Sequence, residues 1–328
     1  MTDLAASDVG LELEAYRREL TAYCYRMMGS AFEAEDAVQE ALVRAWRNLG
    51  TFEGRASLRS WLYRIATNVC LDHLKGRQRR ARPMDLGPAK TVFTDIELAV
   101  LPDATWVEPI PDRMVFSDVA DPADQTVARE TVRLAFVAAL QHLPPRQRAV
   151  LILRDVLRWQ ASEVAELLET TVASVNSALQ RAHATIADHD PKDTDAYRPM
   201  DEAQEALLAQ FVDAFERYDL DLLTTLLHED VVQSMPPFDL WISGPDAVRR
   251  WWEGPGAACK GSVIVTTVGA NGMPAFGQYR PSGPGGAHEP WAVHVLEMKA
   301  DQIVGIHSFL DTPRLFPLFG LPQTPAAS

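Results

Sequence analysis

Residues 30–82 place an acidic amphipathic helix directly before a stretch that is rich in arginine and aromatic residues. Ser30 followed three residues later by Glu33 is a capping-box signature, and apolar residues then recur at helical spacing as far as Trp46. One face of this helix is therefore predicted to pack in a core, while the other carries side chains that packing does not need. Those side chains are Asp36, Gln39, Glu40 and Arg44. They indicate either a solvated face or a docking surface for another macromolecule.

The stretch after this helix concentrates positive charge in an otherwise acidic chain. Its basic residues are Arg55, Arg59, Arg64, Lys75, Arg77, Arg79, Arg80 and Arg82, with Asp72 as the one acid among them. The whole chain has a net charge of −14, divided into +2 over residues 1–90, −7 over 91–200 and −9 over 201–328. Such a chain is repelled by phosphate unless its positive charge is concentrated. Trp61, Tyr63 and Asn68 add rings and an amide that suit unpaired bases, so the sequence predicts nucleic-acid binding here.

These residues resemble region 2 of the sigma-70 family, in its small extracytoplasmic-function (ECF) group. The resemblance is carried by Ala34-Glu-Asp-Ala-Val-Gln-Glu-Ala-Leu and by the stretch from Phe52 to Leu74. It implies that region 2 covers residues 10–82 and that Asp36, Gln39 and Glu40 bind the clamp helices of the RNA polymerase β′ subunit. It also implies that the basic stretch melts the −10 promoter element and captures a flipped base. The residues implied in −10 binding are Arg59, Trp61, Arg64, Asn68 and Lys75.

A second helical module is predicted at residues 126–188. One helix is expected from Asp124 to Leu140, and the prolines at 144 and 145 begin another that runs to Leu157. A short helix, a turn at 169–171 and a final helix with an apolar seam then indicate a helix-turn-helix, with Thr171 as its N-cap.

The helix-turn-helix pattern alone is weak, because packed helix pairs occur in many helical domains. Arg154-Asp-Val-Leu-Arg-Trp and Val175-Asn-Ser-Ala-Leu-Gln-Arg-Ala, however, are similar to sigma region 4. This resemblance implies reading of the −35 element in the major groove and binding to the polymerase β flap. The residues implied in −35 binding are Arg158, Ser174, Ser177 and Arg181. Arg181 is the one firm positive charge of the recognition helix, so we expect affinity to come mainly from the polymerase complex.

Residues 83–125 read as an acidic, proline-rich linker between the two modules. Its acids are typical of a solvated connector. The sigma-factor resemblance implies a further role, because the corresponding connector threads through the active-site and RNA-exit channel of the polymerase. A linker motif of Trp106, Glu108 and Pro109 is similar to the tryptophan and proline motif of sigma factors that carry a fused C-terminal domain.

Residues 201–320 change in character from helical to mixed. Two helices are expected up to Leu227, followed by strands at 262–268, 275–279, 292–298 and 302–309, which favours a cone-shaped α+β domain. The pattern resembles the SnoaL-like, NTF2-like superfamily, so the expected fold is multidomain: two all-α sigma domains and then this α+β domain. Relatives with this fold enclose pockets and include cyclases and isomerases. Residues expected to line a candidate pocket are Asp230, Met235, Trp241, Tyr279, Trp291 and His294.

No acid–base pair with diagnostic spacing stands out among the histidines and acids of this last domain, so we expect no enzyme activity, no catalytic residue and no cofactor. Cys24, Cys70 and Cys259 have neither metal-ligand nor disulfide spacing, which predicts a reduced, cytoplasmic protein without a metal. No apolar run approaches membrane-spanning length, and no membrane partner is expected.

Three functions remain open at the level of sequence. The favoured one is a sigma factor that binds core RNA polymerase and promoter DNA, with its activity modulated in cis by the C-terminal domain. The second is a SnoaL-type pocket enzyme with a helical regulatory appendage. The third is a helix-turn-helix regulator that senses a small-molecule ligand. The acidic face with Asp36, Gln39 and Glu40 separates the first from the third, because a repressor does not need a polymerase contact.

Overall fold

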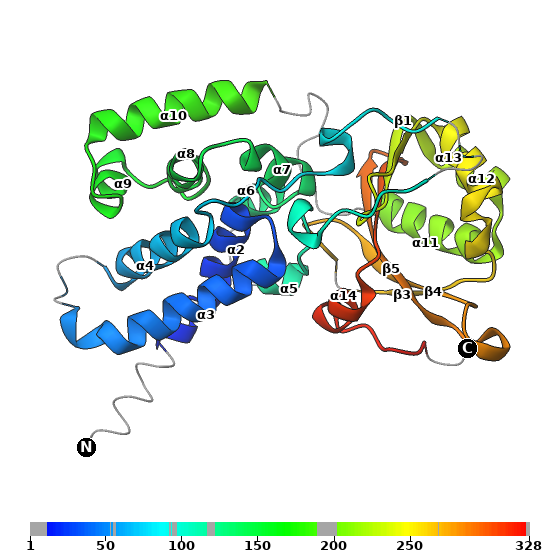
Figure 1. Cartoon of the computed structure of the whole chain (residues 1–328), viewed down its shortest axis with the longest axis horizontal. Coiled ribbons are helices and arrows are strands. Elements are labelled where there is room, and N and C mark those ends of the chain that lie inside the picture. Colours follow the sequence, from blue (N-terminus) through cyan, green and yellow to red (C-terminus); the bar gives the residue numbers. More distant parts are fainter. Residues whose placement is uncertain are drawn as a thin grey trace, which may run out of the picture. The chain divides into compact units, whose positions relative to one another are not determined.

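The computed structural model describes residues 12–52, 54, 57–91, 93, 97–116, 122–188, 202–267 and 269–325. The chain divides into two compact units, each drawn from two stretches of sequence. The first unit contains residues 1–80 and 113–192, and the second contains residues 81–112 and 193–328. In the described residues the first unit is helical, and the second is built around a mixed β-sheet (Figure 1). The expected combination of helical domains and an α+β domain is confirmed.

Three helices form the N-terminal part of the first unit: α2 (Arg17–Met28), α3 (Ala31–Asn48) and α4 (Leu58–His73). The predicted capping at Ser30 is confirmed, because its Oγ accepts a hydrogen bond of 3.2 Å from the Glu33 amide. Ser57 caps α4 in the same way with the Ser60 amide, at 3.1 Å. The alanine-rich face of α3 is fully buried, as its periodicity predicts. The caps and this face fix the position of α3 against α2 and α4.

The rest of the first unit is also helical. Its elements are α5 (Asp112–Val115), α6 (Pro122–Glu130), α7 (Leu134–Gln141), α8 (Pro145–Leu151), the π-helical turn η4 (Ile152–Val156), α9 (Ala161–Leu167) and α10 (Val172–Ala187). The predicted N-cap at Thr171 is confirmed by a 3.1 Å hydrogen bond from the Ser174 amide to its Oγ1. Helix α10 packs on α8 and α9, which completes the helix-turn-helix.

The single helix expected from Asp124 to Leu140 is wrong, because the structure divides it into α6 and α7. The Ala128 carbonyl, which an unbroken helix would pair with the Val132 amide, accepts instead from Arg26 Nη2 at 3.1 Å. The Val132 amide turns to the Arg129 carbonyl at 3.3 Å. A long-range contact to a buried guanidinium thus competes with local helix propensity.

A six-stranded sheet forms the centre of the second unit. Its strands are β1 (Leu227–Ser234), β2 (Trp241–Ser243), β3 (Val263–Thr266), β4 (Ala275–Arg280), β5 (Glu289–Lys299) and β6 (Gln302–Phe309), in the order β2-β1-β6-β5-β4-β3. The β1–β6 pair is parallel and the other pairs are antiparallel. Sequence analysis missed β1 and β2. In strand β1, Leu227 is followed by the polar residues His228, Glu229 and Asp230, which hide its apolar alternation.

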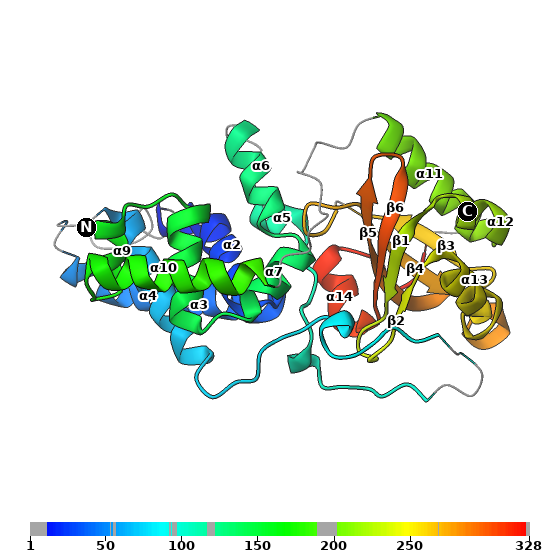
Figure 2. The same cartoon turned by 90° about the horizontal axis from the view of Figure 1, so that it is seen from above.

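Helices cover both faces of this sheet (Figure 2). Helices α11 (Glu202–Arg217), α12 (Leu220–Thr225) and α13 (Pro245–Glu253) lie on one face, and α14 (Thr312–Phe319) lies on the other. The core on the first face includes Phe211, Trp251 and Phe276, all of them buried. The register places Phe276, His294 and Ser308 side by side in one row of this face. The face of the sheet under α11, α12 and α13 is therefore filled by aliphatic and aromatic side chains, with the buried His294 among them.

His294 is held in this core as a neutral imidazole. Its Nε2 lies 2.7 Å from Gln278 Oε1 and its Nδ1 lies 3.0 Å from Ser308 Oγ, while its ring stacks on Phe276 at 4.8 Å. Burial lowers the pKa of His294 to about 3, from an ordinary value near 6.5. In the unfolded chain the same imidazole takes up a proton below about pH 6.5.

We predict that the second unit loses stability as the pH falls from about 6.5 towards 3. The unfolded state binds more protons in this window, so the free energy of unfolding falls by about 1.4 kcal/mol per pH unit. Hydrogen exchange of the β5 amides in the full chain measures this loss. His294→Gln should flatten the pH dependence, whereas the control His288→Gln, at a half-buried position outside this core, should leave it intact. Equal pH dependence in both variants would contradict the assignment to His294.

Candidate polymerase and promoter-binding surfaces

The acidic face of α3 presents its three predicted residues within one turn of helix. Asp36 and Gln39 are exposed, and Glu40 is half-buried. Gln39 Oε1 accepts a hydrogen bond of 3.2 Å from Arg17 Nη2. The spacing of three and four residues places these groups side by side, so the structure brings the predicted set together.

Glu40 is oriented by a residue that sequence analysis missed. His73, at the end of α4, places its Nε2 2.9 Å from Glu40 Oε2, and Arg44 binds the other carboxylate oxygen. The hydrogen bond from His73, with the help of Arg44, lowers the pKa of Glu40. Glu40 is therefore anchored as a carboxylate between α3 and α4. No local pattern links positions 33 residues apart, so only the packed helices reveal this contact.

Helix α4 and the turn that follows it carry four of the five residues predicted for −10 binding. Trp61, Arg64 and Asn68 follow at intervals of three and four residues, which in a helix share one side, and Lys75 lies in the turn just beyond α4. Asn68 is exposed. Trp61 is half-buried, with its ring 5.1 Å from that of Phe52. Lys75 Nζ lies 2.7 Å from Asp72 Oδ1 and stays largely exposed. We call this set the strand face of α4.

Arg59 lies on the other side of α4, apart from the strand face. Its Nε is 3.0 Å from Glu19 Oε2, and its guanidinium stands over the rings of Tyr63 and Trp159, at 5.2 and 5.7 Å. These contacts occupy Arg59 within the first unit. In this structure it does not join the other four residues, because it lies nine positions before Asn68 and two before Trp61, and both separations place it on the opposite side of the helix.

The arginines that follow α4 are largely paired within the chain. Arg77 and Arg80 both bind the carboxylate of Glu33, and the Arg80–Glu33 contact measures 3.0 Å. Arg79 contacts the His142 ring. The positive charge counted in the sequence is thus partly neutralised by acids and acceptors outside the basic run. The sequence shows how many arginines there are, but it does not show which acids and acceptors pair with them.

Helix α10 exposes two of its predicted DNA contacts freely and uses a third in its own cap. Ser177 and Arg181 are exposed. The hydroxyl of Ser174 accepts a 3.0 Å hydrogen bond from Thr171 Oγ1. Arg158, in the turn before α9, is exposed with a left-handed φ of 57°. Gln180 is exposed as expected, and sequence analysis missed the exposure of Val172 and Asn176.

Residues 81–112, which we call the connector, pack on the second unit. The Ile110 amide donates to Asn271 Oδ1, and the Asn271 amide donates to the Ile110 carbonyl, both at 3.0 Å. Nearer its start, the Trp241 indole donates to the Gly87 carbonyl at 2.8 Å. The structure therefore divides the predicted linker of residues 83–125 at residue 112. Only its first part belongs with the C-terminal domain.

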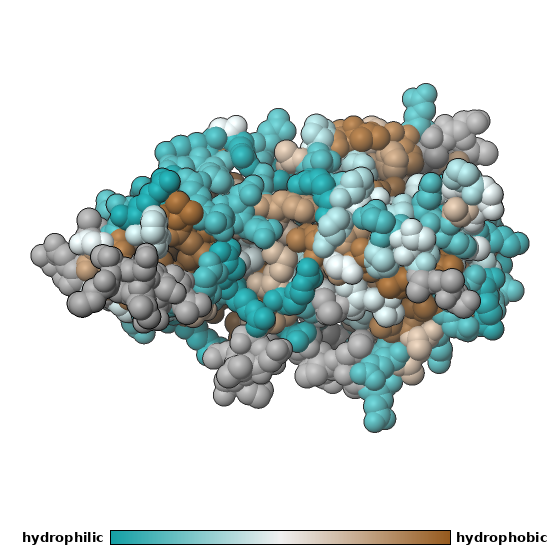
Figure 3. All heavy atoms as spheres, turned by 90° about the horizontal axis from the view of Figure 1, so that it is seen from below, coloured by the Kyte–Doolittle hydropathy of each residue, from teal (hydrophilic) through white to brown (hydrophobic). Residues whose placement is uncertain are grey.

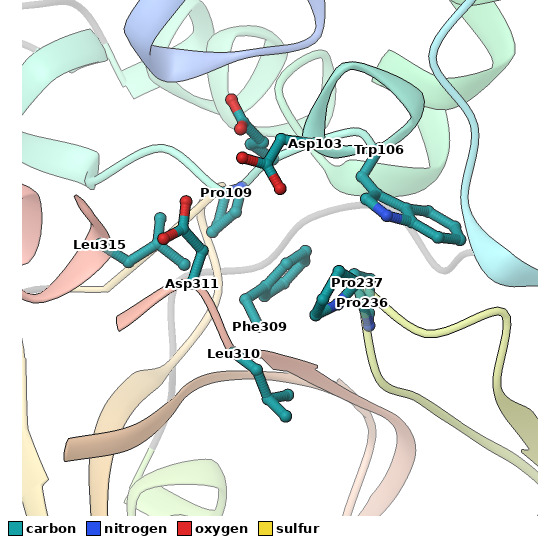
Figure 4. A pocket seen from close by; sticks show the side chains of 10 residues that line it. Asp103, Trp106, Pro109, Pro236, Pro237, Phe309, Leu310, Asp311 and Leu315 are labelled. Atoms are coloured by element: carbon teal, nitrogen blue, oxygen red, sulfur yellow. The ribbon is translucent and has the colours of Figure 1, made fainter. Parts of the chain in front are cut away.

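The linker motif lies at a hollow between the connector, the end of β1, the end of β6 and α14 (Figure 4). Trp106 and Pro109 face Phe309, Pro236 and Pro237 across it. Trp106 and Glu108 are both more than nine-tenths buried. A single cation, Arg314, contacts three acids at the rim, with its Nη1 3.4 Å from Asp103, 3.4 Å from Glu108 and 3.1 Å from Asp311. We call this group the Arg314 cluster.

The six residues of the candidate pocket are not gathered in one site. His294 faces the helices, and Met235 belongs to the same core. Tyr279 packs on Phe316 of α14, and its hydroxyl donates to the Pro322 carbonyl at 2.7 Å. The other three are dispersed: Asp230 is exposed on β1, Trp241 binds the connector, and Trp291 stacks with Arg280.

The surface of the described residues mixes polar and apolar side chains. Figure 3 shows apolar patches set among hydrophilic residues on one face. The large apolar side chains that are exposed are Val43, Trp46, Leu86, Val100 and Val172. Within the described part of the chain, no helix has both the length and the apolarity that crossing a membrane requires.

Comparison with known proteins matches three family models along the chain. Sigma-70 region 2 matches residues 13–80, Sigma-70 region 4 matches residues 133–186, and the SnoaL-like domain matches residues 208–306. The ECF RNA polymerase sigma factor SigG of Mycobacterium tuberculosis is 46% identical over 325 residues, covering 98% of this chain and 86% of the relative. The chain belongs to the ECF sigma factors of the sigma-70 family.

Other ECF sigma factors share parts of this organisation. SigJ of Mycobacterium tuberculosis is 30% identical over 227 residues, covering 67% of this chain and 62% of the relative. A crystal structure of SigJ from that organism has a TM-score of 0.60 and 22% identity, and covers 95% of this chain and 99% of the other. This likeness shows that the fold is shared. Membership of the ECF family makes the chain a transcription initiation factor that works with core RNA polymerase and promoter DNA.

We predict that Asp36→Arg weakens binding to core RNA polymerase by at least tenfold without unfolding the protein. The substitution reverses an exposed charge on the acidic face and leaves the buried face of α3 unchanged. Titration of labelled protein with core polymerase measures the affinity. Glu35→Arg, the same charge reversal at an exposed neighbour on another side of α3, is the matched control. Unchanged affinity for Asp36→Arg would reject this face as the contact.

We predict that Arg181→Ala weakens promoter binding by the holoenzyme to a similar degree on different promoter sequences. Loss of one phosphate contact should also reduce the slope of log affinity against log salt by about one. Filter binding at several salt concentrations gives both values. The slope should stay at its wild-type value in Arg217→Ala, which removes an exposed arginine from α11 in the second unit. An unchanged slope in Arg181→Ala would mean that this side chain does not meet phosphate.

Proposed function

We propose that this ECF sigma factor is restrained by its own C-terminal domain, which holds the connector between its two DNA-reading modules. In this proposal α3 docks on the β′ clamp helices through Asp36, Gln39 and Glu40. The strand face of α4 captures the −10 strand, while α10 reads the −35 element and its module meets the β flap. The C-terminal domain acts by binding and not by catalysis.

The packing of the connector on the second unit carries this proposal. Paired hydrogen bonds between Ile110 and Asn271 fix its end. The Asp112 amide donates to the Gly269 carbonyl at 3.1 Å, and the Asp112 carboxylate accepts from the Gly272 amide at 2.8 Å. Backbone hydrogen bonds at Lys90 and Leu101, of 2.8 and 3.0 Å, fix its start and middle. A segment held at so many points is not available to thread through a polymerase channel. Release of the connector is therefore a step on the way to the active holoenzyme.

In the Arg314 cluster, ion pairs join the connector to the C-terminal domain. Asp103 and Glu108 belong to the connector, whereas Asp311 and Arg314 belong to the C-terminal domain. One guanidinium thus neutralises connector acids that, in this family, are expected to lie where nascent RNA would pass. The same carboxylates repel one another once the cation is removed. The domain holds the connector partly through this one side chain.

We predict that Arg314→Glu raises run-off transcription by roughly threefold with bacterial core polymerase and the full chain. Arg314 is partly exposed, so each ion pair contributes no more than about 1 kcal/mol, and reversal adds repulsion. Arg249→Glu is the matched control, because this arginine also joins two acids, Asp221 and Glu253, but does so away from the connector.

A chain that ends near residue 200 tests the same proposal without relying on one side chain. Its transcription should differ from that of the full chain on the same promoter. Equal transcription from the wild type, Arg314→Glu and the shortened chain would exclude regulation in cis. A screen of a promoter library with wild-type holoenzyme, run first, identifies the promoter for these comparisons.

A further inference from the structure

Regions 2 and 4 pack against each other within the first unit, and this packing cannot persist on a promoter. Helix α10 packs on α9, and α9 packs on α4, so a single helix lies between the two reading helices. At an interaxial distance of 8–10 Å for each packed pair, this separation is about 20 Å. The −35 and −10 elements lie about 25 base pairs apart, or about 85 Å at 3.4 Å per base pair.

Trp159 of region 4 packs against region 2. It is 6% exposed, its ring lies 5.1 Å from that of Tyr63, and Arg59 stands over it. The π-helical turn η4 and the left-handed Arg158 immediately precede it, and the Trp159 amide bonds to the Leu153 carbonyl at 2.9 Å. This irregular backbone turns the indole toward α4.

Glu166 adds an ionic contact at the edge of the strand face. Its Oε1 lies 3.5 Å from Arg64 Nη2, while its own side chain remains 70% exposed. Arg64 is one of the four residues of that face. A carboxylate of region 4 thus occupies the position next to Arg64 that a strand phosphate would take.

The other contacts between regions 2 and 4 include buried polar groups, which reduces the free-energy cost of separating the two regions. Arg26 and Arg148 are each 3% exposed, and their hydrogen bonds run across the interface to backbone carbonyls. Burial lowers the pKa of both guanidinium groups to about 10. Among the described residues the Trp159 indole N–H, also buried, has no hydrogen-bond acceptor. Water would satisfy these groups on opening, which offsets part of the lost contact.

We propose that the free protein rests in a closed state in which Trp159 and Glu166 latch region 4 onto region 2, and that opening of this latch limits binding to core polymerase. This inference rests on the proposed two-site reading of the promoter. It differs from the restraint by the C-terminal domain, because both halves of the latch lie in the sigma regions. When region 4 leaves, Arg64 loses its carboxylate partner and is free to meet the −10 strand.

The latch makes the apparent affinity for polymerase depend on the open fraction of the free protein. Glu166→Arg places a cation opposite Arg64 and should tighten core binding by roughly threefold. Trp159→Ala removes the buried ring and should tighten it by roughly tenfold. Trp159→Phe keeps an aromatic ring against Tyr63 and should remain close to wild type. Glu169→Arg is the matched charge control, at an exposed position just beyond α9.

Opening is measured directly by the distance between nitroxide labels in the full chain. The labels are placed at R47C on α3 and A184C on α10, both exposed, in a background with Cys259→Ser. Wild type and Glu169→Arg should give one short-distance population. Trp159→Ala and Glu166→Arg should populate longer distances, as should wild type bound to core polymerase. Because Glu166 is largely exposed, its variant keeps the test valid if Trp159→Ala folds poorly.

Two results would overturn the latch. One is a distance distribution that does not change in either variant, and the other is a change in distance without a change in core affinity. Failure of the proposed function has a different signature. In that case no form of the protein binds core polymerase, while the distances still report whether Trp159 and Glu166 hold region 4 on region 2.

Discussion

The side chain of Arg148 is the contact on which the helical unit depends. Its guanidinium binds the Met27 carbonyl of α2, the Gln141 side chain and the Leu143 carbonyl, so it joins the end of one sigma region to the start of the other. Arg26 makes the reciprocal contact from α2 to Thr131 and Ala128. Carbonyl oxygens carry only partial charges, so the two buried cations are solvated without being neutralised. That balance suits an interface that must hold in one state and separate in another.

The connector is the second feature that constrains the structure. It lies between the two sigma regions in the sequence, but it packs with the C-terminal domain and not with either region. Its contacts run to the C-terminal domain through backbone amides and carbonyls as well as side chains. Backbone hydrogen bonds depend little on which side chains are present, so a proline-rich and acidic segment can still be held firmly. Its specificity comes from few side chains, chiefly the buried Trp106 and the acids that meet Arg314.

Much of the fold could be predicted from the sequence, because capping and periodicity are local signals. Ser30 and Thr171 begin their helices where the pattern places them, and the alanines of α3 are buried. The break between α6 and α7 could not be predicted, because it depends on a guanidinium more than one hundred residues away. Strand β1 was missed because the acids Glu229 and Asp230 are exposed near its start and interrupt its apolar pattern. Composition likewise described the connector as solvated, whereas Ile110 is fully buried.

The candidate binding surfaces also combine features that local sequence patterns predict with features that depend on contacts between distant residues. Helical spacing alone places Trp61, Arg64 and Asn68 on one side of α4, and the same geometry places Arg59 on the other side. Counting arginines overestimates the charge available to DNA, since Glu33 and Glu19 take up several of them. The chain has a net charge of −14, and each internal ion pair weakens its binding to phosphate for two reasons. The cation is already neutralised by an acid of the chain, and its side chain is held in another position. Arg59 and Arg64 are paired with Glu19 and Glu166, whereas Arg158 and Arg181 are exposed, so the proposed opening bears on binding of the −10 element more than on reading of the −35 element.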